Sequence, residues 1–181
     1  MRSAFQHLLP EGEKGRGGSL ALIITLVFAL VLALSVASGL WSATADHDTT
    51  PAPAELAGFR LIGSMAGPEA ISEVNELHGT EIEIVDAWIG HYQQGGTVWV
   101  ARAASELKAR ELLDVMVLGI EEGSSPFKGL TQQDFQGMPL YTVRDARQIH
   151  FFYQIGAQVV WLAAPPGAED AFLAKAVNEV S

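Results

Sequence analysis

The longest apolar stretch of the chain lies near its N-terminus. Residues 20–40 read LALIITLVFALVLALSVASGL, which is 21 residues without a charged side chain. At about 1.5 Å of rise per residue, a helix of this length spans roughly 30 Å, the thickness of a bilayer's hydrocarbon core. Within lipid, only a helix satisfies all the backbone hydrogen bonds of a single segment. We therefore expect residues 20–40 to form a transmembrane helix.

The charges on the two sides of this segment predict its orientation. The N-terminal side carries Arg2, Lys14 and Arg16, whereas the C-terminal side has no Lys or Arg before Arg60. The positive-inside rule then places residues 1–19 in the cytoplasm as a short stub and the rest of the chain outside it. The expected localisation is the cell membrane, with a single pass and an extracytoplasmic C-terminal domain.

A cleaved signal peptide is the alternative explanation of the same segment. Ala43, Thr44 and Ala45 fit the small-x-small pattern of a cleavage site, and a basic region precedes the apolar run. The apolar region of a signal peptide is usually about 7–15 residues long, however, and this one is longer. We favour an uncleaved signal anchor, and both interpretations export the same domain.

A linker follows the apolar segment. Residues 41–57 include Pro51 and Pro53, and their composition does not favour a packed core. Proline-containing segments tend to be extended and semi-rigid, so this linker keeps the next domain close to the membrane surface. We place the folded domain at residues 58–181.

The first half of the domain has the pattern of strands alternating with helices. Strands are predicted at residues 59–64, 81–92 and 97–102, the last two joined by a turn at Gly95-Gly96. One helix is expected to begin at Pro68 and end at Gly79, because proline suits a first helical turn and glycine suits a C-terminal cap. A second helix begins after Ser105, a suitable N-cap, and ends near Gly123.

The second half is richer in strands. Residues 138–144, 148–154 and 158–163 are predicted strands, residues 130–135 are a weak strand, and residues 168–180 form a final helix. Residues 98–101 (Val-Trp-Val-Ala) and 160–163 (Val-Trp-Leu-Ala) resemble each other, and a predicted helix follows each. A duplicated ββα unit explains this similarity, although any two hairpin-plus-helix units share such a pattern by chance.

The two similar strands are apolar on both faces, which affects the predicted architecture. A strand covered on one face only usually alternates between apolar and polar side chains. We therefore predict an α+β fold in which a small two-layer domain of antiparallel hairpins and helices, ferredoxin-like in the broad sense, has further cover. An extra β layer or a second subunit would supply that cover.

The exported part of the chain is acidic. From Asp46 onward there are 8 Lys and Arg against 19 Asp and Glu, a formal charge of −11. Such a surface repels nucleic acid and anionic lipid headgroups, so nucleic acid is not an expected partner. The chain has no Cys, which excludes disulfides, Cys-type zinc sites and covalent c-type haem attachment.

No catalytic or phosphate-binding motif is present in the sequence, and we expect a protein that is not an enzyme. The strongest metal-ligand candidates are His91 and His150, which the internal similarity places at comparable positions of two strands. With a carboxylate such as Asp86, they would suit zinc or copper, or two imidazoles could bind haem non-covalently. Ordinary half-buried strand residues are the competing interpretation.

Aromatic residues gather on the predicted hairpins. Trp88, Trp99, Phe151 and Tyr153 would form an interaction surface if they were exposed, and a core if they were not. The expected function is a membrane-tethered extracytoplasmic interaction module, an accessory subunit of an envelope or membrane complex that binds a protein partner or a second copy of itself. The alternative is a metal- or haem-binding domain with a role in electron transfer.

Overall fold

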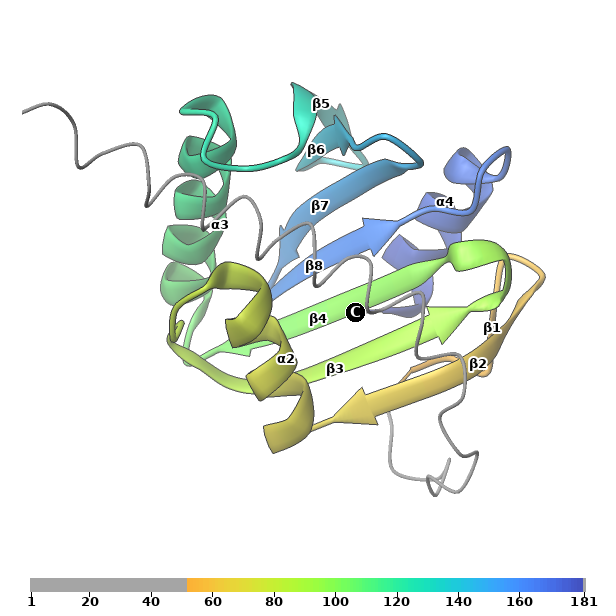
Figure 1. The fold of residues 1–181 in the computed structure, drawn as a ribbon, viewed down its shortest axis with the longest axis horizontal. Helices are drawn as coiled ribbons and strands as arrows, with labels where there is room; N and C mark the ends of the chain where they lie inside the picture. The colour runs from red at the N-terminus through yellow and green to blue at the C-terminus, as the bar shows by residue number, and fades with distance from the viewer. Residues whose placement is uncertain (1–51, 181) are drawn as a thin grey trace, which may run out of the picture.

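The computed structural model describes residues 52–180 (Figure 1). The predicted cytoplasmic stub, the predicted transmembrane helix at residues 20–40 and residues 41–51 of the predicted linker lie outside this part. No helix within residues 52–180 is both long enough and apolar enough to cross a membrane.

Eight antiparallel strands form one continuous sheet, and neighbouring strands in each half are consecutive in the chain. The order across the sheet is β1-β2-β3-β4-β8-β7-β6-β5. The strands are β1 (Glu55–Leu56), β2 (Phe59–Ala66), β3 (Ile84–Tyr92), β4 (Thr97–Ala103), β5 (Lys128–Phe135), β6 (Met138–Arg144), β7 (Ile149–Ile155) and β8 (Gln158–Ala163). The two halves meet where β4 pairs with β8, at the centre of the sheet.

Three α-helices pack on this sheet, and local sequence explains where they begin and end. They are α2 (Pro68–His78), α3 (Glu106–Glu121) and α4 (Glu169–Glu179). Gly79 caps α2 in the left-handed conformation, at φ 67°, which glycine adopts without a steric penalty. The Ser105 hydroxyl caps α3 by accepting a hydrogen bond from the backbone N–H of Lys108. These predicted helix boundaries are confirmed.

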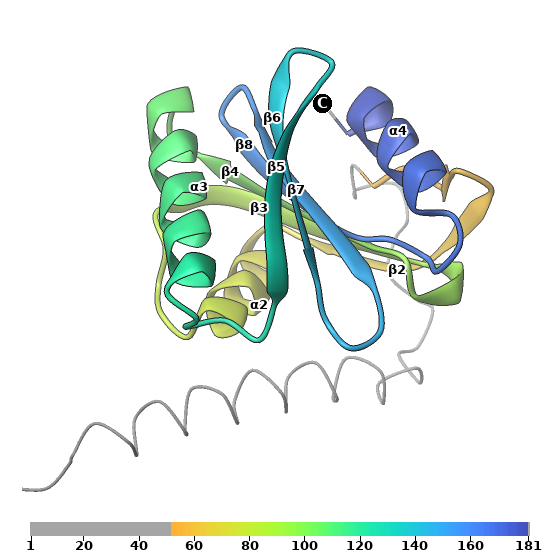
Figure 2. The ribbon, with the colours of Figure 1, turned by 90° about the horizontal axis from the view of Figure 1, so that it is seen from above.

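The helices cover opposite faces of the sheet (Figure 2). On one face, α2 packs through Val74 against β3, and α3 packs through Leu113 against β7 and β8. We call this the α2/α3 face. On the other, the α4 face, the ring of Phe172 meets that of Tyr92 with centroids 5.7 Å apart and packs with Leu162 in the same cluster.

The α+β class is confirmed, but the predicted two layers are wrong because helices lie on both faces. At the centre of the sheet β4 and β8 have apolar side chains on both faces, and the chain's own helices pack on both faces in place of the predicted extra β layer. β2 and β3 are direct antiparallel neighbours, whereas a ferredoxin-like fold splits such a pair. The similarity between the two hairpins does not extend to the helices, since α3 and α4 lie on opposite faces.

The domain begins earlier than the sequence predicted, and its last edge strand is stronger. Leu56, which was assigned to the linker at residues 41–57, is fully buried and lies in β1. The Tyr92 hydroxyl also donates a hydrogen bond to the carbonyl of Pro53, over 3.1 Å. At the other edge, the weak strand predicted at residues 130–135 is the eight-residue strand β5.

Candidate functional site

A row of aromatic rings crosses the middle of the α2/α3 face. Trp99 of β4 and Trp161 of β8 are directly opposite each other, and Phe152 of β7 and Tyr141 of β6 continue the row. The rings of Trp161 and Phe152 stack with centroids 4.7 Å apart, and those of Phe152 and Tyr141 stack at 5.0 Å. Stacked cross-strand rings stabilise a sheet and hold one another in place.

A groove runs above the two tryptophans, between α2 and α3. Because α2 packs mainly over β2 and β3 while α3 packs over β7 and β8, the seam between β4 and β8 is less covered. Trp99 and Trp161 are only partly buried there. The groove is lined almost entirely by apolar side chains, chief among them Val74, Ile82, Trp99, Leu112, Met116 and Trp161.

The free volume of this groove is about 40 Å³. A site for a cofactor or a drug-sized ligand usually measures about 300–1,000 Å³. A single water needs at least about 10–15 Å³ on a comparable measure, so this groove has room for a few small atoms. It suits the end of one apolar side chain.

The outer side of α3, which faces away from the sheet, is also apolar. Three large side chains of α3 are more than half exposed, Leu107 at 64%, Val115 at 67% and Leu118 at 53%. Isolated exposed apolar residues are ordinary, but these three lie within three turns of one helix that also supplies Leu112 and Met116 to the groove. Together, the groove and these residues form what we call the α3 apolar surface.

One lysine links the two walls near the start of α3. The Lys108 ammonium lies 3.0 Å from a carboxylate oxygen of Glu111 and 3.4 Å from one of Glu83. The hydrogen bond and charge of Glu111, followed by those of Glu83, raise the pKa of Lys108. All three side chains are largely exposed, so the pairs contribute little to stability. They place two carboxylates beside Ile82 and Leu112.

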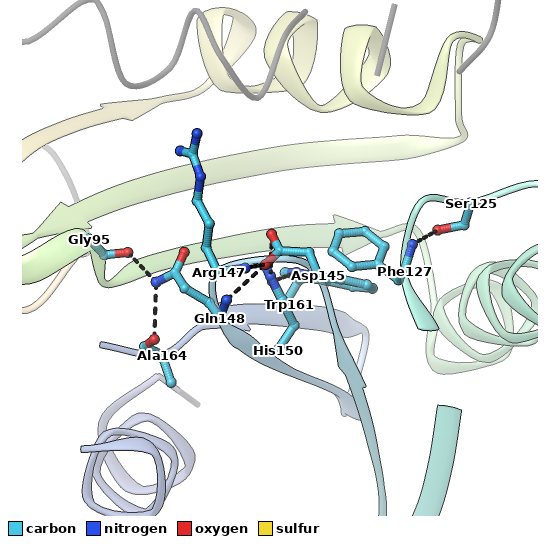
Figure 3. A network of polar contacts seen from close by, with 9 residues as sticks. All are labelled: Gly95, Ser125, Phe127, Asp145, Arg147, Gln148, His150, Trp161 and Ala164. Carbon is cyan, nitrogen blue, oxygen red and sulfur yellow. Dashed lines mark hydrogen bonds and ion pairs between the residues drawn. The ribbon is translucent and has the colours of Figure 1, made fainter. Parts of the chain in front are cut away.

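Trp161 is held from behind by a buried histidine (Figure 3). Its indole N–H donates a hydrogen bond to Nδ1 of His150, over 3.1 Å. Because an indole nitrogen can only donate, Nδ1 carries no proton, and the proton of the neutral ring is on Nε2. Nε2 lies 3.2 Å from a carboxylate oxygen of Asp145 without the alignment of a hydrogen bond. The ring of Phe127 meets that of His150 at 4.8 Å.

Asp145 is itself fixed by the turn between β6 and β7 (Figure 3). Its other carboxylate oxygen accepts hydrogen bonds from the backbone N–H groups of Arg147 and Gln148, at 2.7 and 2.8 Å. The side-chain amide of Gln148 donates to the carbonyls of Gly95 and Ala164, at 2.9 and 3.0 Å. This network ties the two hairpin turns to the residue that orients Trp161.

The electrostatics of the network keep His150 neutral. Burial lowers the pKa of His150, and the nearby Asp145 carboxylate opposes this only in part. For Asp145, burial acts to raise the pKa, but hydrogen bonds from two backbone N–H groups and the nearby His150 outweigh it, so the pKa is lowered. Both ring nitrogens of His150 face a partner and the residue is only 2% exposed. The arrangement therefore positions Trp161 and offers no free base to a substrate.

The two histidines proposed as metal ligands lie in one row of the sheet but do not meet. His91 is opposite Thr97, Thr97 is opposite Ala163, and Ala163 is opposite His150. They are therefore three strand spacings apart, about 14 Å. In this arrangement a single ion could not contact both. Across residues 52–180, no group of three or more His, Cys, Asp and Glu is arranged to hold a metal ion.

Of the four aromatic residues predicted to form an interaction surface, only Trp99 lines the groove. Trp88, Phe151 and Tyr153 are at most 9% exposed and belong to the core on the α4 face. Trp161, which is opposite Trp99, is also an aromatic residue of a predicted hairpin, but the four predicted interaction residues include neither it nor the residues that α3 contributes. The helical spacing of Leu112 and Met116 identified them as apolar positions, but spacing does not show which apolar positions a neighbouring helix leaves uncovered.

In comparisons with known proteins, the chain matches no family model, no curated protein and no solved structure.

Proposed function

We propose that the protein is a membrane-tethered interaction module that binds a protein partner through the groove between α2 and α3. In this proposal residues 20–40 anchor the chain, the domain lies outside the cytoplasm, and the protein is an accessory subunit of a complex in the cell envelope. The observation that carries it is the groove itself, an apolar surface with two partly exposed tryptophans at its floor.

The dimensions of the groove favour a protein partner over a small ligand. A free volume of about 40 Å³ accepts one side chain, and the exposed residues of α3 extend the contact beyond it. Tryptophan is enriched among the residues that contribute most to binding between proteins, where a central aromatic pocket is surrounded by less critical contacts. Trp161 is also fixed by His150 and Phe152, so little conformational entropy would be lost when a partner binds.

The tether supports a partner in or near the membrane. Between the predicted anchor and Ala52 there are 11 residues, 41–51, which span at most roughly 40 Å when fully extended. A linker of this length confines the domain to a thin layer above the bilayer and raises its effective concentration relative to other proteins in that layer.

The test uses the full-length protein, extracted from its own membranes in a mild detergent. We expect a native mass greater than one chain and a defined co-purifying protein. Val115→Glu places a charge in the α3 apolar surface and Met116→Glu places one in the groove, and both should abolish co-purification. Ala171→Glu is the matched control, because Ala171 is exposed on α4 on the other face of the sheet.

Thermal unfolding of each variant shows whether it is folded. Met116→Glu could destabilise the domain, whereas Val115 is 67% exposed, so Val115→Glu should leave the fold intact and still test the surface. A single-chain mass, or a partner retained by both variants, would overturn the proposal. A visible absorption band or bound metal in the same preparation would instead favour a metal- or haem-binding function.

A further inference from the structure

The negative charge of the described residues is concentrated in the segment that contains α2 and α3, the two helices on either side of the groove. Residues 68–122, which include both α2 and α3, carry eleven Asp and Glu against three Lys and Arg, a formal charge of −8. Residues 123–180 carry five against four, a formal charge of −1. Solubility alone does not require such an asymmetry, since charge spread over the whole surface would serve equally well.

The carboxylates of α2 are not neutralised within the described domain. From Pro68 to Glu83 there are five Glu and no Lys or Arg. Burial, followed by the charges of Glu76 and Glu69, raises the pKa of Glu73. On the opposite wall, the single ammonium of Lys108 is shared between Glu83 and Glu111. The surroundings of the groove would therefore be stabilised by added positive charge.

Apolar and acidic groups alternate closely on the exposed side of α3. Glu111 lies one turn after Leu107 and one turn before Val115, and Leu118 is a further turn along. At about 1.5 Å per residue, the strip from Leu107 to Leu118 is roughly 17 Å long. A partner helix of three or four turns matches this length, with apolar side chains on one face and basic side chains beside them.

We propose that the groove binds a basic amphipathic helix of a partner protein. An apolar side chain of that helix enters the groove above Trp99 and Trp161, and its Lys or Arg side chains meet Glu83 and Glu111. This inference rests on the proposed function and names the chemistry of the partner.

Charge disfavours two other occupants of the same surface. A symmetric dimer through this surface would bring Glu83 and Glu111 of one copy close to the same carboxylates of the other, which opposes association. A membrane containing anionic lipid would be repelled for the same reason. A basic partner instead gains in association rate from the long-range field, and that gain falls as salt is added.

The test measures binding of three labelled synthetic peptides to the full-length protein in nanodiscs of neutral lipid, with empty nanodiscs as the background. The peptides are 18 residues long: a Leu/Lys amphipathic helix, a Leu/Glu helix with the same leucine positions, and a Lys/Gln helix without leucine. Fluorescence anisotropy gives each affinity. We expect the Leu/Lys peptide to bind at least about tenfold more tightly than either of the others, and to weaken as salt shortens the screening length from about 10 to 3 Å.

Three double variants locate the site. Val115→Asn with Leu118→Gln removes exposed apolar groups without changing the charge, and should weaken binding of the Leu/Lys peptide about tenfold. Glu83→Gln with Glu111→Gln should weaken binding of the Leu/Lys peptide several-fold and make that binding less dependent on salt. Asp170→Asn with Glu179→Gln removes the same charge from α4 on the other face, where Glu179 pairs with Lys175 as Glu111 pairs with Lys108, and should leave binding unchanged.

The possible failures are distinguishable. If the Leu/Lys and Leu/Glu peptides bind equally, and Val115→Asn with Leu118→Gln weakens both, the charge inference is wrong and the groove remains the site. If that apolar variant leaves Leu/Lys binding unchanged, the peptide binds elsewhere and the inference is overturned. A failure of all three peptides to bind also overturns it, whereas the proposed function is judged separately by co-purification.

Discussion

Replacing Trp161 with Phe removes one hydrogen bond from a buried histidine, and Trp99 provides a matched control. The two tryptophans are opposite each other on the same face of the sheet and are both partly buried. Either Trp→Phe change removes the same ring atoms. Only Trp161→Phe also removes the N–H donor from Nδ1 of His150, since among the described residues no hydrogen bond is found for the Trp99 indole.

The expected difference between the two variants is about 1–3 kcal/mol, the cost of leaving one buried polar group without its partner. His150 cannot avoid this cost by moving its proton from Nε2 to Nδ1. The bare Nε2 would then face the Asp145 carboxylate at 3.2 Å, acceptor against acceptor. The loss of ring area costs about as much in Trp99→Phe and therefore cancels in the comparison.

The pH dependence provides a second, independent check. Burial lowers the pKa values of His91 and His150 below that of an unfolded histidine, about 6.5. As the pH falls below about 6.5, the unfolded chain therefore binds protons that the native chain does not, and the free energy of unfolding decreases. In Trp161→Phe, Nδ1 of His150 is free to accept a proton, and the charged ring is stabilised by the Asp145 carboxylate near Nε2. The excess destabilisation over Trp99→Phe should therefore shrink between pH 8 and pH 5.

The assay is urea unfolding of the full-length protein in detergent, followed by circular dichroism so that the changed tryptophans do not affect the signal. Equal free energies of unfolding for the two variants, within about 0.5 kcal/mol at pH 8, would refute the argument that His150 holds Trp161. So would an excess that does not depend on pH.

Two further matched pairs test the packing. Gly96→Ala should destabilise the domain by about 1–3 kcal/mol, because its Cβ would lie 3.0 Å from Pro165 and 3.1 Å from Phe172. Gly63→Ala should be near neutral, because no atom of the described residues would lie within 4 Å of its Cβ. Thermal unfolding compares the stabilities of the two variants. Tyr92→Phe should cost about 0.5–1.5 kcal/mol by removing the hydrogen bond to Pro53. Tyr153→Phe should be neutral or stabilising, because it removes a buried hydroxyl that has no hydrogen-bond partner among residues 52–180. Urea unfolding measures both free energies, and equal effects of the two changes would contradict the prediction.

The sequence predicted the local elements well wherever a local cause was visible. Pro68 and Gly79 bracket α2, and Ser105 caps α3, because these residues act on the backbone within one turn of themselves. The strands β6 and β8 have the predicted boundaries. The pairing of β4 with β8 could not be predicted from the local sequence, because the two strands are about sixty residues apart and a local pattern does not show which strands pair.

The errors arose where composition and tertiary context disagree. Leu56 lies in a proline-containing segment that reads as a linker, yet its side chain fills the core beside α4. The sequence is compatible with either a surface or a core position for Trp88, Phe151 and Tyr153. They belong to the core because α4 packs on their face of the sheet. His91 and His150 were expected to be able to converge across a sheet; they lie on the same face and in one row, but two strands separate them.

Photo-crosslinking from the α3 apolar surface tests the central claim most directly. Because the chain has no Cys, Leu118→Cys creates one reactive thiol on α3, and Ala171→Cys creates one on α4 as the control. Each variant is labelled with a benzophenone maleimide and illuminated in its native membrane. We expect a single protein adduct from position 118 that is absent from position 171 and is lost when Met116→Glu is added. No adduct from position 118, or the same adducts from both positions, would contradict binding in the groove between α2 and α3.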